Sequence, residues 1–199
     1  MNVLRAMITI LSVPLTILNF FGGIVALIWL GMLGEWSLLG LGVGLILLGA
    51  FSLGFALLPS LVLAMPLQKF EQSGNKVGLF TLGFISSVYT NGVLTAWCIG
   101  ILYIFVKDAT TSNYIPSLLL AYTVATTPIN YMAQKEQQGG DGSFALISAM
   151  FAQFAFLTTV GALLFFNVTL IHLVIVFASV MLLNVISQFV MATNQVSYP

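Results

Sequence analysis

The stretch VGLFTLGFISSVYTNGVLTAWCIGILYIFV, residues 77–106, decides the fold of this chain. It runs for thirty residues without a charge, between Lys76 and Lys107. About 20 apolar residues are enough to carry an α-helix across the hydrocarbon core of a bilayer. The stretch therefore predicts a transmembrane helix, and the rest of the chain follows the same pattern.

The composition of the whole chain is that of a membrane protein. Of its 199 residues, five are Lys or Arg and five are Asp or Glu, so that 5% are charged and 60% are hydrophobic. Soluble domains carry about 25% charged residues. This composition excludes a soluble enzyme, a secreted domain and a disordered chain. The net charge is zero, so the chain has no excess of cations with which to bind nucleic acid. No nucleic-acid partner is therefore expected.

The few charges divide the chain into apolar segments. They occur near residues 5, 35, 69–76, 107–108 and 135–141. Between them the sequence predicts transmembrane helices at 6–33, 38–67, 77–106, 114–132, 144–166 and 168–191. We expect one all-α, polytopic transmembrane domain over residues 1–199, with six spans or, as the alternative, five.

The last two spans come from one apolar stretch, 143–191. As a single helix it would reach roughly 70 Å, far more than a bilayer is thick. Asn167-Val168-Thr169 is its polar break, so we predict the turn there. The first apolar segment, 6–33, is too long for a signal peptide and is interpreted as a retained first span.

Orientation follows from the cations in short loops. With six spans, Arg5, Lys69, Lys76 and Lys135 fall on one side of the membrane and Lys107 on the other. Cytoplasmic loops carry the excess of Lys and Arg, so both termini are predicted to be cytoplasmic. The short loops favour a bacterial inner membrane, with an organelle membrane as the alternative. The lipid bilayer is the expected partner.

Polar side chains recur at helical spacing on several of the predicted spans. Because lipid offers polar groups no partner, these faces are expected to turn inward. They either join helices by hydrogen bonds or line a cavity for a small solute. The candidate cavity-lining residues are Thr16, Asn19, Thr90, Asn91, Thr123, Thr126, Thr127, Asn130 and Gln153.

Two functions fit this pattern. The first is a channel-like or transporter-like conduit for a small neutral solute or an ion, since no predicted span carries a charge at mid-membrane. Similar loops at 68–75 and 134–141 hint at the internal repeats of transport folds, although chance explains such a likeness too. The second is a non-catalytic membrane subunit or assembly factor that packs against partner membrane proteins, in a homo-oligomer or a larger complex.

Enzymatic activity is not expected. The sequence holds no HExxH, no GxSxG and no paired intramembrane Asp. With one Cys and one His, it offers no metal-ligand cluster, and no cofactor is predicted. The one histidine, His172, lies near the outer end of the last span and is either an interfacial residue or a pH-sensing gate.

Gly40 and Gly44 form a GxxxG motif in the second predicted span. Glycines at this spacing let two helix backbones approach closely. We expect the pair to be a helix-packing site within the bundle, with an oligomer interface or a hinge as the alternative.

Overall fold

The computed structural model describes residues 2–54, 58–138, 143–166 and 169–195, and over these ranges the chain is all-helical. This confirms the predicted fold class at the level of secondary structure. The helices are α1 (Asn2–Met32), α2 (Trp36–Gly54), α3 (Leu58–Gln72), α4 (Lys76–Val106), α5 (Tyr114–Gln138), α6 (Ser143–Phe166) and α7 (Leu170–Gln195).

The predicted span 38–67 differs most from the structure. It corresponds to two helices, α2 and α3, and the link between them, 55–57, lies outside the described residues. The predicted turn near 167–169 agrees with the structure in its position, because α6 ends at Phe166 and α7 begins at Leu170. Residues 167 and 168 themselves are not described.

Several helices run beyond the ends of the apolar segments. α3 continues past Leu67 to Gln72, and α5 continues past Met132 to Gln138. The added residues are mostly Gln, Lys and Glu, which are good helix formers. The limits of hydrophobicity in the sequence therefore mark where the chain becomes polar, and not where its helices end.

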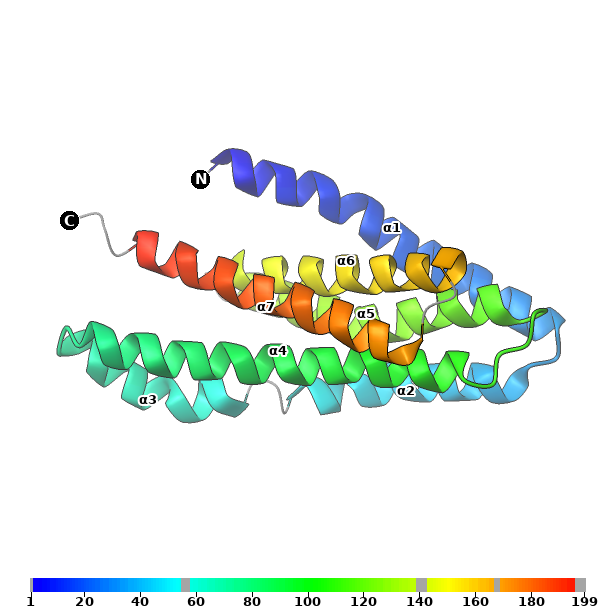
Figure 1. The fold of residues 1–199 in the computed structure, drawn as a ribbon, viewed down its shortest axis with the longest axis horizontal. Coiled ribbons are helices and arrows are strands. Elements are labelled where there is room, and N and C mark those ends of the chain that lie inside the picture. The colour runs from blue at the N-terminus through cyan, green and yellow to red at the C-terminus, as the bar shows by residue number, and fades with distance from the viewer. Residues whose placement is uncertain (1, 55–57, 139–142, 167–168, 196–199) are drawn as a thin grey trace.

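α5 is the central helix of the bundle. It packs against α1, α2, α4 and α6, while α7 packs against α4 and α6, and α3 packs against α4 (Figure 1). The side chains of Ala121, Val124 and Ala125 on α5 are fully buried. α4 runs along nearly the whole molecule, with α2 and α3 following it end to end (Figure 1).

α2 approaches the core through two glycines that the GxxxG motif does not contain. A Cβ at Gly49 would lie 2.7 Å from Pro128 and 2.8 Å from Trp97, and one at Gly42 would lie 3.0 Å from Leu120. At Gly40 and Gly44 a Cβ would meet nothing within 4 Å among the described residues. This corrects the expectation of packing within the bundle at that pair, since the motif lies on the opposite side of α2 from α5.

The surface of the bundle is rich in large apolar side chains. Outward-facing examples include Phe51 on α2, which is 78% exposed, and Phe165 on α6, which is 81% exposed. Within the described residues, two helical segments are long and apolar enough to cross a membrane, Val13–Met32 and Val77–Val106. Shorter apolar segments occur in α2, α6 and α7. The six-span arrangement and the single transmembrane domain stay predictions.

Candidate functional site

The predicted polar face of α1 meets that of α5 in a set of hydrogen bonds that we call the Asn19 cluster. The Asn19 amide donates from Nδ2 to Oγ1 of Thr126, and its Oδ1 accepts from the Thr127 hydroxyl at 3.1 Å. The Thr123 hydroxyl lies 3.2 Å from the backbone oxygen of Asn19. Gly23 makes this approach feasible, because a Cβ there would come within 2.8 Å of Thr123. The helical spacing of these residues thus does place them on one interface.

A second set, the Gln153 cluster, joins α5 to α6. The Tyr122 hydroxyl donates to Oε1 of Gln153 at 3.2 Å, and Nε2 of Gln153 donates to Oδ1 of Asn130. The same hydroxyl lies 3.4 Å from the backbone oxygen of Leu15 on α1. The ring of Tyr122 packs against Phe156, with ring centroids 5.8 Å apart. Gln153 is 4% exposed, so its amide is bonded inside the bundle.

A third set, the Asn91 pair, joins α4 to α7. Asn184 donates from Nδ2 to Oδ1 of Asn91 at 2.7 Å. Nδ2 of Asn91 donates in turn to the backbone oxygen of Ser87 at 2.8 Å. Both asparagines are buried, at 0% and 3% exposed. The three sets therefore tie together five helices: α1, α4, α5, α6 and α7.

The other predicted polar site residues are Thr16 on α1, Thr90 on α4 and His172 on α7. Thr16 is exposed and Thr90 is half-buried. His172 is exposed, and its Nδ1 lies 2.7 Å from the Thr169 hydroxyl one helical turn away. The pH-sensing role of His172 stays a prediction, and so does the lining of a cavity by the candidate residues.

Two side chains of the three sets described above, Tyr122 and Asn184, were not among the predicted site residues. Tyr122 precedes Thr126 by four residues, so the two share a face of α5. This spacing would have been enough to include Tyr122 among the predicted residues. Asn184 is the partner of Asn91, but the two are 93 residues apart, and no pattern in one sequence pairs them.

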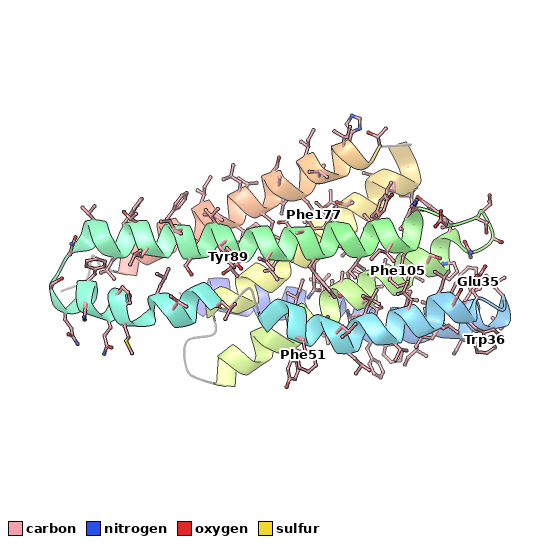
Figure 2. All side chains as sticks on the ribbon, turned by 90° about the horizontal axis from the view of Figure 1, so that it is seen from below. Glu35, Trp36, Phe51, Tyr89, Phe105 and Phe177 are labelled. Carbon is pink, nitrogen blue, oxygen red and sulfur yellow. The ribbon has the colours of Figure 1, made fainter. Side chains whose placement is uncertain are left out.

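The turns at one end of the molecule are also joined by a side-chain hydrogen bond. Nδ2 of Asn113, just before α5, donates to Oε1 of Glu35 at 2.9 Å, and the backbone N–H of Thr110 donates to Oδ1 of Asn113 at 2.7 Å. Asn113 is 4% exposed. Glu35 and the neighbouring Trp36 lie at this end, beside the α1–α2 turn (Figure 2).

The chemistry available to these sets is that of neutral hydrogen bonding. Their members are amides, hydroxyls and a phenol, held within a few ångströms of one another on facing helices. No group of three or more His, Cys, Asp or Glu that could hold a metal ion occurs in the part of the chain that the structure describes. Cys98 is fully buried in the apolar core. The arrangement is suited to fixing helices in register.

Comparison with protein-family models, with curated proteins and with solved structures finds no match to this chain. Over the described residues the fold is all-helical, with two candidate membrane-spanning helices and a hydrogen-bonded polar interior.

Proposed function

We propose that the chain is a multi-pass integral membrane protein that acts as a non-catalytic subunit, packing against partner membrane proteins. Six crossings result, because α1, α4, α5, α6 and α7 each form one and α2 and α3 together form another. Both termini then lie in the cytoplasm of a bacterial cell. The apolar side chains exposed on all the helices, together with 5% charged residues, support a bilayer as the solvent.

The observation that carries the subunit role is the pairing of the polar interior. Asn19, Asn91 and Gln153 each bond a side chain on another helix. Amides used in this way hold helices together in a medium that offers no other partner. A conduit needs such groups turned toward a passing solute, whereas these are directed at each other.

The contact surface that we assign to a partner helix is the outward side of α2. Gly40 and Gly44 leave room for a backbone from outside the chain, because no described atom lies within 4 Å of a Cβ at either position. Leu47 and Phe51 continue this side of the helix and are 66% and 78% exposed. Small residues flanked by large apolar ones are typical of helix–helix contacts in membranes.

The experiment is to measure the mass of the complex in a mild detergent by light scattering. We expect the wild-type chain to run as an oligomer or with a stoichiometric partner, and the double variant Gly40→Leu/Gly44→Leu to lose that association. Gly83→Leu is the matched control, because Gly83 on α4 is also exposed and open. A monodisperse wild-type monomer without a partner would contradict the subunit role.

A conduit for a small neutral solute or an ion is the second candidate. The observation that favours it is that Ser117 Oγ and Thr159 Oγ1 are buried without a hydrogen-bond partner among the described residues. Buried hydroxyls are seldom left without one in proteins. Solute flux in reconstituted vesicles tests this candidate directly.

A further inference from the structure

The hairpin formed by α3 and residues 76–88 of α4, here called the α3–α4 hairpin, differs from the rest of the bundle. α3 packs against α4, whereas α2 packs mainly against the central helix α5. Two features shape the turn between α3 and α4. Gly74 has φ +65, and the backbone N–H of Gly78 donates to Oδ1 of Asn75 at 3.0 Å. The ring of Phe70 lies against Gly78 and closes the hairpin at this turn.

This hairpin extends beyond the end of the central helix. Nε1 of Trp97 donates to the backbone oxygen of Ala125 at 3.1 Å, which fixes the relative height of α4 and α5. From that height the apolar part of α4 continues to Val77, a rise of about 30 Å, whereas α5 becomes polar at Gln134 after about 13 Å. Figures 1 and 2 both show α5 ending well short of the α3–α4 turn.

The sides of the hairpin are apolar and its tip is polar. Val62, Met65 and Val77 are 71%, 77% and 76% exposed. The polar residues gather at 68–76, which includes Lys69 and Lys76. This is the pattern of a segment whose sides meet hydrocarbon and whose end meets headgroups.

We propose that the α3–α4 hairpin is embedded in lipid acyl chains up to its tip. The apolar layer that surrounds the protein is then about 17 Å taller beside this hairpin than beside the end of α5. This inference rests on the proposed multi-pass membrane arrangement. It adds that the hydrocarbon layer is thicker beside the hairpin than beside the end of α5, on the cytoplasmic side of the bilayer. The partner is the acyl chains of the surrounding lipid, with headgroup phosphates at Lys69.

Two features argue for lipid over water. Large apolar side chains standing in water would be unfavourable, and the sequence holds no charged residue between Phe51 on α2 and Lys69 near the tip of the hairpin. α4 is one unbroken helix from Lys76 to Val106, with α3 alongside it, so the hairpin stands along the bundle axis and does not lie flat on the membrane surface. Bilayers accommodate such excess length by local thickening or by tilt of the protein.

The test uses single cysteines in the purified full chain, reconstituted into vesicles. The native Cys98 is fully buried and serves as an unreactive background. Met65→Cys and Val77→Cys report on the sides of the hairpin. Phe20→Cys on α1, 61% exposed within the apolar segment Val13–Met32, is the reference for lipid exposure, and Ser73→Cys, at the exposed turn, is the reference for water.

Each cysteine is labelled with bimane to measure quenching by lipids brominated on their acyl chains. In parallel it is reacted with a charged maleimide that is introduced on both sides of the vesicles. We expect Met65→Cys and Val77→Cys to be quenched like Phe20→Cys and to react about tenfold more slowly than Ser73→Cys, because the charged reagent does not enter the hydrocarbon layer. Fast reaction without quenching would place the hairpin in water, and slow reaction without quenching would mean that a second copy covers it. Either result overturns the proposal.

The reference variant distinguishes failure of the membrane arrangement from failure of the hairpin inference. If Phe20→Cys itself reacts as fast as Ser73→Cys and is not quenched, the multi-pass arrangement is wrong. If Phe20→Cys behaves as a lipid-exposed residue and the hairpin cysteines do not, only the inference about the hairpin fails.

Discussion

Asn184 on α7 donates a hydrogen bond to Asn91 on α4, with 2.7 Å between Nδ2 and Oδ1, and both side chains are buried. The two residues lie 93 positions apart in the chain. A buried amide depends on other groups of the protein for its hydrogen bonds. The pair therefore fixes the height of α7 against α4, and the same reasoning applies to the Asn19 and Gln153 clusters.

The first prediction concerns this pair. Asn184→Leu removes the donor to Asn91, and we expect a loss of about 1 kcal/mol in the free energy of unfolding, measured by SDS titration in bicelles. A double-mutant cycle with Asn91→Leu should give a coupling of roughly 0.5 to 1.5 kcal/mol. Thr158→Val is the control, because that hydroxyl is exposed and bonds the backbone oxygen of Phe154 on its own helix. A coupling near zero would mean that the asparagines do not hold the two helices together.

The second prediction concerns the α5–α6 contact. Tyr122→Phe keeps the ring against Phe156 but removes the hydroxyl that donates to Gln153. We expect the unfolding free energy to fall by about 1 kcal/mol, because a buried acceptor loses its donor. Tyr89→Phe is the matched control, since Tyr89 is 44% exposed on α4 (Figure 2). Equal stability of the two variants would contradict a structural role for the Tyr122 hydroxyl.

The third prediction separates two glycines of one helix. At Gly49 a Cβ would meet the rings of Pro128 and Trp97 at less than 3 Å, whereas at Gly44 it would meet no described atom within 4 Å. We expect Gly49→Ala to lower the thermal midpoint of the monomer, measured in a detergent that dissociates the complex. In the same monomer Gly44→Ala should raise it, since alanine in a helix is favoured over glycine by about 0.5 to 1 kcal/mol. The reverse order of midpoints would show that α2 packs through its GxxxG side within the chain.

The fourth prediction concerns the turns at the α1–α2 end. Glu35→Ala removes the acceptor of the Asn113 amide, and we expect a loss of about 1 kcal/mol in unfolding free energy. Glu35→Gln keeps an oxygen at the same position and should retain most of the stability. If both substitutions cost the same, the carboxylate charge, and not the hydrogen bond, would be what stabilises the turns.

The sequence was sufficient to predict the helical class and most of the helix positions. Charged residues are so few that each one marks a boundary, and the polar break at 167–169 was enough to divide one 49-residue stretch. The division of 38–67 into α2 and α3 was not foreseen, because that range is almost continuously apolar and hydropathy alone does not reveal an interruption.

The polar interior was predicted in part for a physical reason. Spacing along one helix fixes which residues share a face, so Thr123, Thr126 and Thr127 of α5 could be expected on one face, and each of them bonds Asn19 of α1. Which face meets which depends on how the helices pack, and a single sequence does not contain that information. For the same reason the open side of α2 was mistaken for its packed side, because GxxxG marks a surface that fits a helix without saying whose helix it is.

We propose that the amides of the interior join helices and do not line a path for a solute. This is tested by the flux of a small neutral solute and of monovalent ions in vesicles that contain the wild-type chain, Asn19→Leu, Asn91→Leu or Gln153→Leu, each shown to be folded. We expect the wild-type flux to equal that of empty vesicles and to be the same in all three variants. Wild-type flux above that of empty vesicles, reduced in the variants, would overturn the proposal and establish the conduit.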